Sequence, residues 1–310
     1  MGEIVVIGSS NTDLILKMEY FPAPGETIEG TSFLQAMGGK GANQALAAHK
    51  LGGNVKFVTC LGNDMNGENT MKYYKRQKLD VSLAITVDGA PSGTAMIWVD
   101  KKGENCIVIN PGANGMLSPE HIDKVKGVIA KADMVVVQME IPYATVQKIC
   151  EIAHRHNTKI LLNVAPASKI DLETIQMIDI LVVNETEAET ISGERIESLG
   201  EEAVVDKLRT MGAQTVVLTL GKKGSLFKND QTYFHVPAFK VEAVDSTAAG
   251  DVFCGALAAG LGKGHDWVKA IKFATAASAL CVMRLGAQPS IPTEREVYDF
   301  LNKKELPYSR

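Results

Sequence analysis

The chain has 310 residues, 45% of them hydrophobic, and a formal net charge of −4. This size and apolar fraction predict one large or two smaller globular domains with a substantial buried core. The weakly acidic balance disfavours a nucleic-acid or membrane-surface partner, no apolar stretch approaches the ~20 residues of a membrane span, and no signal peptide is recognisable, so we expect a cytoplasmic protein.

Short apolar runs alternate with amphipathic segments along most of the chain. Fully apolar runs of this kind are typical of strands buried on both faces, so the alternation predicts an α/β three-layer sandwich with a mostly parallel central sheet flanked by helices. The predicted strands are Ile4–Ile7, Val55–Thr59, Met134–Gln138, Ile160–Asn163, Ile180–Val183 and Val216–Leu220. The predicted helices are Ala42–Lys50, Gly67–Lys78, Tyr143–His156, Glu201–Met211, Val252–Leu261 and Trp267–Met283.

Two segments interrupt this alternation, namely Thr27–Ala36 and Thr94–Ile109. Their pattern predicts β-ribbon without an intervening helix. A turn at Asp100–Gly103 divides the second segment, and apolar residues fall on both of its faces. A two-stranded ribbon cannot bury both faces alone. We therefore expect one α/β domain over residues 1–310 with a β lid, inserted from about 14–37 and 92–109, that covers a ligand and forms a homodimer contact. The alternative is a hairpin that packs on its own domain.

The five cysteines are scattered, with no C-x-x-C pair and no histidine cluster nearby. This distribution predicts reduced, buried thiols and disfavours a cysteine-based metal centre. The residues are Cys60, Cys106, Cys150, Cys254 and Cys281.

Polar side chains gather where the predicted strands end. Open α/β sheets bind ligands beyond the carboxyl ends of their strands, so these residues predict a ligand site at one edge of the sheet. Each of them alone could equally be an ordinary turn residue. They are Asn11, Asp13, Glu140, Asn163, Asn184, Glu187, Thr219 and Gly221.

The glycine-rich segment Met37–Asn43 precedes a predicted helix. Its spacing does not fit a Walker A loop, and no G-x-G-x-x-G follows the first strand, so P-loop and nicotinamide chemistry are both disfavoured. Lys40 and Asn43 instead read as hydrogen-bond donors, projected from a tight backbone and suited to hydroxyl oxygens. The alternative for Lys40 is a surface lysine in a glycine turn.

The segment Asp245–Asp251 brackets small residues with two carboxylates, and a long helix pattern follows it. Small side chains let a ligand approach the backbone, and the first turn of a helix offers free N–H groups that favour an anion such as phosphate. A carboxylate beside a bound phosphate makes chemical sense if Asp251 takes a proton from an incoming hydroxyl. The alternative is an Asp or Ser N-cap on an ordinary core helix.

With these motifs in place, the chain resembles the ribokinase family of sugar kinases, within the wider ribokinase/phosphofructokinase-B-like group. The resemblance covers essentially the whole length, and six motifs occur in the order typical of the family. They are Gly8–Asp13, Gly38–Ala45, Asn184–Glu187, Thr219–Gly224, Asp245–Asp251 and Gly286–Ser290.

The resemblance implies a role for each matching position in the transfer of a phosphoryl group from ATP to a sugar. Asp251 resembles the general base, and the backbone of Ala248, Ala249 and Gly250 resembles the anion hole. The sugar contacts implied are Asn11, Asp13, Gly39, Lys40, Asn43 and Glu140, together with Asp251 itself.

The nucleotide and the cations are also implied by the resemblance. Asn184, Thr219, Gly221, Gly224, Gly250 and Thr275 resemble positions that bind ATP, although family members often carry Asn or His at the position of Thr275. Glu187 resembles a residue that organises Mg²⁺ through water. A K⁺ site is implied at Asp245, Thr247, Cys281, Arg284, Gly286 and Ser290, with backbone carbonyls as ligands at Thr247, Cys281, Arg284 and Gly286.

The residue types also bear on the choice of substrate. A carboxylate at Asp13 can accept hydrogen bonds from two adjacent hydroxyls, as a furanose diol requires, and the sugar motifs carry no apolar surface for a nucleobase. We therefore expect transfer to the O5 hydroxyl of D-ribose. The alternatives are a kinase for another small sugar, such as 2-deoxyribose, fructose or a sugar acid, and a catalytically silent sugar or nucleotide sensor.

Overall fold

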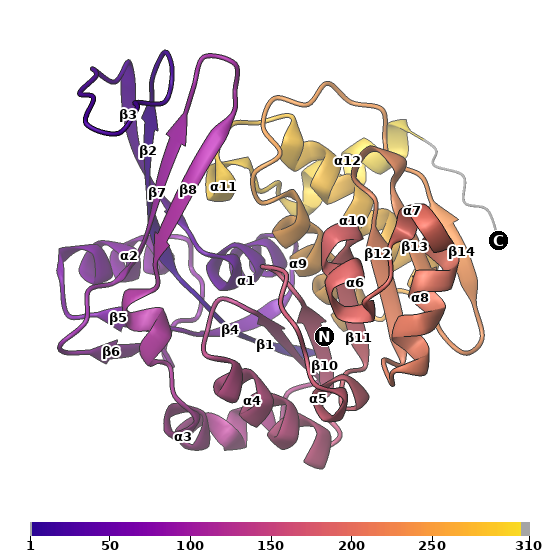
Figure 1. Ribbon diagram of the computed structural model, residues 1–310. Coiled ribbons are helices and arrows are strands. Elements are labelled where there is room, and N and C mark those ends of the chain that lie inside the picture. The colour runs from indigo at the N-terminus through magenta and orange to yellow at the C-terminus, as the bar shows by residue number, and fades with distance from the viewer. Residues whose placement is uncertain (1, 305–310) are drawn as a thin grey trace.

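The computed structural model describes residues 2–304, and its centre is an eight-stranded sheet (Figure 1). The strand order is β14-β13-β12-β11-β10-β9-β1-β4, and the six strands from β12 to β4 are parallel, whereas β13 is antiparallel to both of its neighbours, β12 and β14. The mostly parallel sheet predicted from the sequence is therefore confirmed. The strands are β1 (Glu3–Ile7), β4 (Asn54–Val58), β9 (Met134–Gln138), β10 (Lys159–Asn163), β11 (Ile180–Asn184), β12 (Thr215–Thr219), β13 (Ser225–Lys228) and β14 (Tyr233–Val236).

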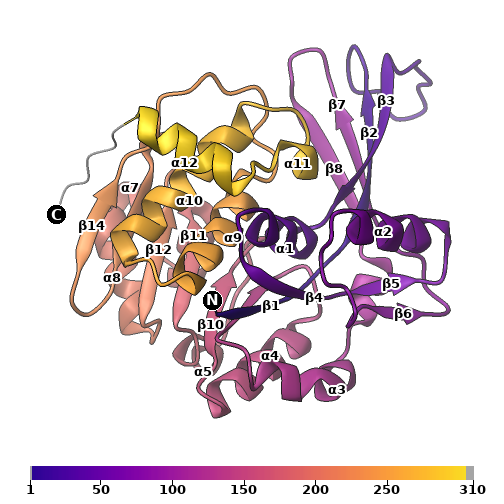
Figure 2. The ribbon, with the colours of Figure 1, turned by 180° about the vertical axis from the view of Figure 1, so that it is seen from behind.

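Helices cover both faces of this sheet, as the two opposite views show (Figures 1 and 2). Successive side chains of β1 enter different cores: Ile4 and Val6 belong to one hydrophobic cluster, and Val5 and Ile7 belong to the other. This explains the unbroken apolar runs, because each strand is buried on both sides. The main helices are α1 (Lys40–Lys50), α2 (Met65–Arg76), α3 (Pro119–Ile129), α4 (Tyr143–Arg155), α6 (Glu185–Ser192), α8 (Glu201–Thr210), α9 (Ala249–Gly262), α10 (Trp267–Val282) and α12 (Glu294–Lys303).

The shorter elements lie in the connections between these. They are the paired strands β5 (Cys60–Gly62) and β6 (Ile85–Val87), the helices α5 (Leu172–Gln176), α7 (Ile196–Leu199) and α11 (Ala287–Ser290), and the 3₁₀ turns η1 (Gly112–Met116) and η2 (Gly221–Lys223).

A separate four-stranded sheet of order β3-β2-β7-β8 projects from the sandwich (Figure 1). It consists of β2 (Asn11–Lys17), β3 (Ser32–Gly38), β7 (Gly93–Val99) and β8 (Asn105–Asn110), and we call it the lid. The hairpin turn predicted at Asp100–Gly103 joins β7 to β8. The predicted strand at Thr27–Ala36 begins only at Ser32, and β2, which the sequence pattern did not reveal, pairs with both β3 and β7.

The two faces of the lid follow from its register. Asp13 lies opposite Ala36 and Ala95, so these three share one face, whereas Met96 pairs with Val108 on the other. The face opposite Asp13 exposes large apolar side chains. They are Phe33 (63% exposed), Met96 (52%), Trp98 (38%) and Val108 (64%).

Cys106 lies in β8 opposite Trp98, and it is exposed. The prediction that all five cysteines are buried is therefore wrong at this position. The reason is that β8 is an edge strand of a sheet whose outer face has no covering layer within the described residues. The thiols of the other four are buried.

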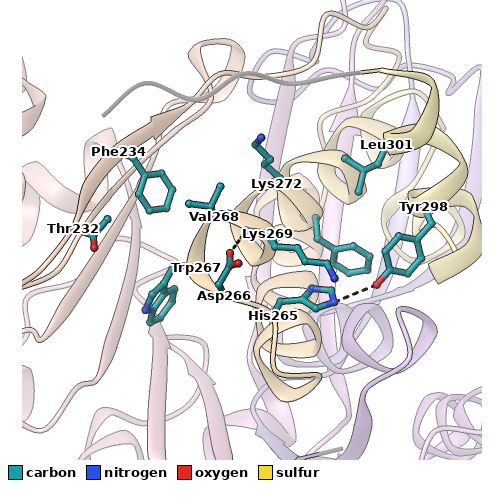
Figure 3. A pocket seen from close by; sticks show the side chains of 11 residues that line it. Thr232, Phe234, His265, Asp266, Trp267, Val268, Lys269, Lys272, Tyr298 and Leu301 are labelled. Atoms are coloured by element: carbon teal, nitrogen blue, oxygen red, sulfur yellow. Dashed lines mark hydrogen bonds between the residues drawn. The ribbon is translucent and has the colours of Figure 1, made fainter.

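No helix in the described part of the chain is both long and apolar enough to cross a membrane. A cavity of about 600 Å³ lies between β14, the start of α10 and α12, with Phe234, Trp267 and Tyr298 in its wall (Figure 3). It lies at the amino-terminal end of α10, whereas Cys281 and Arg284 of the predicted cation site lie at the other end of that 16-residue helix. A helix of this length spans about 24 Å, so the cavity is remote from the predicted site.

Candidate active site

A second cavity, of about 230 Å³, lies at the carboxyl ends of β10, β11 and β12. The structure therefore brings together residues predicted separately as base, anion hole, nucleotide and magnesium contacts. Its lining comprises Lys40, Asn163, Ala165, Val182, Asn184, Glu187, Thr219, Ser246, Ala248, Ala249, Gly250, Asp251 and Cys254.

The first turn of α9 forms one wall of this cavity. Ala248 caps the helix with a left-handed backbone (φ 61°, ψ 7°), a conformation that costs an L-residue about 1 kcal/mol or more. The N–H of Ala249 donates to the carbonyl of Ser246 (3.2 Å). Those of Gly250 and Asp251 have no acceptor among residues 2–304, as expected at a helix start, so they are available to an anion.

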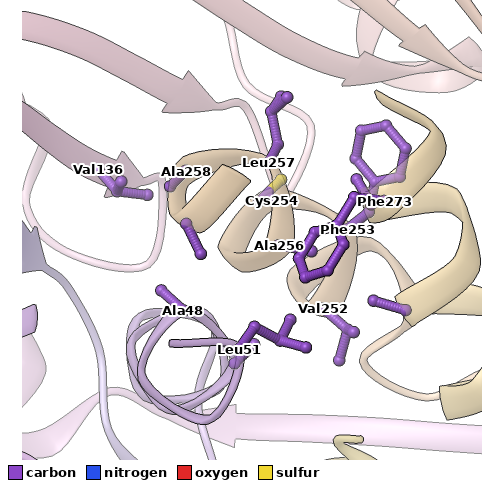
Figure 4. Packing of buried hydrophobic residues seen from close by; sticks show 14 of the residues in the cluster. Ala48, Leu51, Val136, Val252, Phe253, Cys254, Ala256, Leu257, Ala258 and Phe273 are labelled. Atoms are coloured by element: carbon purple, nitrogen blue, oxygen red, sulfur yellow. The ribbon is translucent and has the colours of Figure 1, made fainter. Parts of the chain in front are cut away.

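The Ala/Gly-rich sequence of α9 sets the position of this turn, because it lets α9 pack closely on α1 (Figure 4). A Cβ on Gly255 would lie 2.6 Å from the carbonyl oxygen of Gln44 and 2.7 Å from the Cβ of Ala47. Asp251 is one helical turn before Gly255 and hence lies on the same face. The close packing therefore places Asp251 against the amide side chains of α1.

Asp251 is buried, and amides hold both of its carboxylate oxygens. Asn43 Nδ2 donates to Oδ2, and Gln44 Nε2 donates to Oδ1, each over 3.0 Å. The carboxylate is thereby fixed in one orientation at the edge of the cavity. An N-cap role, the alternative that the sequence left open, is excluded, because Ala248 is the N-cap residue and Asp251 lies in the first turn.

Asp13 is a second buried carboxylate, but it has no hydrogen-bond partner in the described part of the chain. Burial, together with the nearby carboxylates of Glu140 and Asp251, raises the pKa of Asp13 to about 7. A Cβ on Gly38 would lie 2.1 Å from Asp13 Oδ2, so only glycine at position 38 leaves room for this carboxylate. Asp13 is thus an acceptor whose donors remain to be supplied by a ligand.

The rest of the glycine segment brings the backbone of β1 and α1 close together. Gly39 has φ 89°, a left-handed value that favours glycine, and a Cβ there would lie 2.8 Å from the backbone N of Asn11. A Cβ on Gly41 would lie 2.6 Å from the backbone of Gly8. Two contacts of Glu140 Oε2 secure the same junction, since it accepts from the N–H of Lys40 (3.1 Å) and from Ser9 Oγ (2.6 Å).

The Lys40 ammonium lines the cavity beside Asp251 and Glu187. Burial lowers the pKa of this ammonium, but the surrounding carboxylates, chiefly Asp251 and Glu140, outweigh burial and raise it. Lys40 therefore carries a positive charge in the space where an anionic group would bind, and the surface alternative is excluded. Its placement suits a phosphate as well as a sugar hydroxyl.

Asn11 is held in place by Asn114, a residue that the sequence did not indicate as part of the site. Asn114 Nδ2 donates to Asn11 Oδ1 (2.8 Å) and to the carbonyl of Ser10 (3.1 Å), while Asn114 Oδ1 accepts from the Ser10 N–H (2.9 Å). These contacts leave the Nδ2 group of Asn11 for a ligand. The signal in the sequence was weak, since it consisted of one polar residue, Asn114, shortly after the Pro111-Gly112 pair.

Asn184 and Glu187 form a capping box at the start of α6. Asn184 Oδ1 accepts from the Glu187 N–H, and Glu187 Oε2 accepts from the Asn184 N–H, each over 2.8 Å. Burial raises the pKa of Glu187, although the Asn184 N–H and the Lys40 charge oppose this. One oxygen of Glu187 remains for a hydrated cation in the cavity, which fits the few carboxylates that Mg²⁺ prefers.

The residues predicted for K⁺ also converge. Asp245 Oδ1 accepts from the Thr247 N–H (2.9 Å) and Oδ2 accepts from the Gly286 N–H (2.8 Å). Burial alone raises the pKa of Asp245, but these donors outweigh burial and lower it. Cys281 Sγ lies 3.7 Å from the Thr247 carbonyl oxygen and 3.0 Å from Ser290 Oγ. One carboxylate amid carbonyl and hydroxyl oxygens is a donor set that fits a monovalent cation.

The predicted nucleotide residues are only partly assembled. Thr219 lines the cavity, and Gly221 (φ 53°) and Gly224 (φ 107°) shape the turn that follows it. Thr275 does not line the cavity, and its hydroxyl donates to the Ile271 carbonyl within α10 (2.8 Å).

An orientated carboxylate beside an anion-binding helix start, with unpaired acceptors for hydroxyls nearby, defines the class of protein. It is a phosphotransferase with an alcohol group as acceptor. The geometry combines the three requirements of phosphoryl transfer, namely a positioned base, positive charge around the phosphate and a site for hydrated metal.

Comparison with known proteins gives the particular family. The model of the pfkB family carbohydrate kinases matches residues 1–294, and the chain belongs to this family. It is 38% identical over 301 residues to ribokinase from Haemophilus influenzae, with 96% of this chain and 98% of that protein covered. It is 35% identical over 305 residues to deoxyribokinase from Salmonella typhi, covering 98% and 100%. The structure of Arabidopsis thaliana ribokinase complexed with ribose and ATP superimposes with a TM-score of 0.91 at 31% identity, covering 97% of this chain and 98% of that one.

Proposed function

We propose that this protein transfers the γ-phosphate of ATP to the O5 hydroxyl of D-ribose, forming D-ribose 5-phosphate. The observation that carries the proposal is the pair of buried carboxylates, one held by amides and one without donors. Asp13 accepts hydrogen bonds from the ribose diol, and Asp251 takes the proton from O5. Ribokinases are among the relatives, and one of them was solved with both ribose and ATP.

The residues of the chain have distinct tasks in this reaction. The N–H groups of Gly250 and Asp251 and the Lys40 ammonium stabilise charge on the transferred phosphoryl group. Asn11 and Asn43 orientate the sugar, and the Thr219–Gly224 turn binds the nucleotide. Glu187 would hold hydrated Mg²⁺ and Asp245 would hold K⁺, and when bound these ions would supply fixed positive charge to the site.

The lid completes the proposal. Its Asp13 face closes over the sugar, and its opposite face, with Phe33, Met96 and Val108 exposed, forms a homodimer contact with a second copy. Exposed apolar surface of this kind is typical of a protein–protein interface. We place the enzyme in the cytoplasm, with small molecules as its ligands.

A panel of sugars tests the substrate. ADP release is measured with D-ribose, 2-deoxy-D-ribose and D-fructose at saturating ATP, Mg²⁺ and K⁺. We expect the highest kcat/KM with ribose, because loss of the 2-hydroxyl leaves part of Asp13 unpaired and costs about 1–3 kcal/mol. Equal or better use of 2-deoxyribose would reassign the substrate, and sugar binding without ADP release would indicate a sensor.

A further inference from the structure

Four buried amide side chains from three different elements lie behind the carboxylate of Asp251, and two of them contact it directly. They form a connected set that we call the amide relay: Gln138 at the end of β9, Gln44 and Asn43 in α1, and Asn163 at the end of β10. All four are buried, and Gln44 and Gln138 are fully inaccessible. Buried amides are retained only when they are hydrogen-bonded, so their partners indicate what they do.

Gln44 is the centre of the relay. Its Nε2 donates to Asp251 Oδ1 and to Asn163 Oδ1, each over 3.0 Å, and its Oε1 accepts from Gln138 Nε2 over 2.7 Å. Asn163 Nδ2 in turn donates to the Val182 carbonyl (3.2 Å). Both ends of the Gln44 amide are therefore fixed by the central sheet, and its position does not depend on any ligand.

Asn43 holds the other carboxylate oxygen in a different way. Its Nδ2 donates to Asp251 Oδ2, but its own Oδ1 is buried without a partner among residues 2–304. That oxygen can accept from a sugar hydroxyl, which would couple Asn43 to the substrate. Gln44 has no such free group, because both of its polar atoms are already used inside the protein.

The fold makes specific room for the far end of the relay. A Cβ on Gly8 would lie 2.0 Å from Gln138 Oε1, so only glycine at position 8 admits the glutamine side chain. A glutamine that ends the apolar run Val135–Val137 is otherwise difficult to explain, since a strand buried on both faces favours apolar residues.

From this geometry we infer that Gln44 is a positioning residue for phosphoryl transfer. Its amide binds Asp251 Oδ1 and thereby orientates the carboxylate so that Oδ2 faces the hydroxyl of the acceptor. Through Gln44, the relay connects Asp251 to residues at the ends of β9 and β10, so the orientation of the base does not depend on the sugar. This inference is based on the proposed function, because it takes Asp251 as the base. It concerns the orientation of the Asp251 carboxylate, and sugar binding is left to Asp13 and the residues around it.

Gln44→Met tests the inference, because it keeps the length of the side chain and removes its amide. We expect kcat to fall about 10- to 100-fold, the range for loss of a hydrogen bond to a charged group, while KM for the sugar changes much less. A loss confined to kcat would separate a positioning role from a role in sugar binding, because Gln44 contacts Asp251 and lies behind it on the side of the central sheet.

Gln147→Met is the matched control. Gln147 Nε2 also donates to an aspartate, Asp171 Oδ2 (2.9 Å), but it lies on α4 away from the cavity. We expect unchanged kcat and KM in this variant. Equal kinetic losses in the two variants would mean a general effect of Gln→Met exchange and would overturn the inference.

Two further variants make the result decisive. Gln138→Met loosens Gln44 without removing its contact to Asp251, so it should give a smaller loss of kcat, again with little change in KM for the sugar. If Gln44→Met does not fold, an unchanged kcat in Gln138→Met overturns the inference. Asp251→Asn separates the two proposals: if it retains turnover the proposed function fails, whereas an inactive Asp251→Asn beside a fully active Gln44→Met refutes only the role of Gln44.

Discussion

Two carboxylates of the candidate site, Asp251 on the sandwich and Asp13 on the lid, differ in the hydrogen-bond donors that the protein gives them. Asp251 receives one amide donor on each oxygen, whereas Asp13 receives none within the described residues, and its pKa rises to about 7. Both are buried. The fold therefore fixes the orientation of the proposed base, Asp251, before a ligand binds, whereas the lid carboxylate depends on a ligand for its hydrogen-bond donors.

The difference follows from where each residue lies. Asp251 lies where α9 packs closely on α1, and Asn43 and Gln44 of α1 each donate to one of its oxygens. Asp13 lies in β2 of the lid, a separate sheet that projects from the sandwich (Figure 1). With the roles that we propose, the group that needs a fixed geometry lies in the core, and the group that recognises the sugar lies on the lid.

The largest expected effect is that of Asp251→Asn. This change keeps the shape and removes the base, so kcat should fall by at least about 10²- to 10⁴-fold, while sugar and nucleotide still bind. Turnover is measured by coupled ADP release, and binding is measured by calorimetry. Near-normal turnover in this variant would contradict the assignment of Asp251 as the base.

Asp13→Asn should act on binding. We expect KM for the sugar to rise about 10- to 100-fold with a smaller change in kcat, because an acceptor of two hydroxyls is lost. KM for ATP serves as the internal control and should not change. A loss confined to kcat would place Asp13 in the chemical step and remove the contrast with Asp251.

The raised pKa of Asp13 also predicts how stability depends on pH. The folded protein retains this proton up to about pH 7, whereas the unfolded chain loses it near pH 4, so the stabilising contribution is complete below about pH 4 and is lost as pH rises to about 7. Relative to Asp13→Asn, the wild type should lose up to ~4 kcal/mol in free energy of unfolding between these values. Parallel pH dependences in urea titrations of the two proteins would contradict this.

Gly38→Ala tests whether the lid carboxylate needs the space that glycine leaves. The new Cβ would lie 2.1 Å from Asp13 Oδ2, so the carboxylate must move, and sugar affinity should fall about tenfold, as expected for one displaced hydrogen bond. Gly127→Ala in α3 is the matched control, since a Cβ there meets no atom within 4 Å. Unchanged sugar affinity in Gly38→Ala would show that Asp13 does not bind in its present position.

The smallest effect is expected from the monovalent cation. Replacing K⁺ by tetramethylammonium should lower kcat several-fold, because one fixed charge beside the helix start is lost while the base and amides remain. Asp245→Asn should reduce this dependence. Identical rates in K⁺, Na⁺ and tetramethylammonium would contradict the cation site.

Much of the fold could be predicted because it depends on local pattern. The apolar runs that became β1, β9 and β12 are buried on both faces, and that requirement is visible in the sequence without knowledge of their neighbours. Strand β2 escaped prediction because its polar start, Asn11–Asp13, belongs to the site rather than to a core. The edge hairpin β13–β14 and the outward thiol of Cys106 depend on which layers cover them, which local sequence does not encode.

For the candidate site, the sequence indicated the residues that we propose contact ligands but not the residues that hold them in place. Asp251, Asp13, Lys40 and Glu187 stand in motifs of small or polar residues whose chemistry is legible in the linear chain. Gln44 and Asn114 stand among residues that read as ordinary helix or turn. Their roles arise from partners more than 100 residues away, with Gln44 bonded to Asp251 and Asn114 to Asn11.

The amino-acid sequence by itself determined the α/β class and the order of the motifs and, through its resemblance to a known family, the candidate reacting groups, since periodicity and motif chemistry are local properties. Only the tertiary structure decided that the Asp251 carboxylate receives two donors from the protein, whereas the Asp13 carboxylate receives none from the described residues. The physical reason is that a carboxylate's orientation and proton affinity depend on burial and on donors from distant segments. Those donors come together only when α1, α9 and the lid have packed around the end of the sheet.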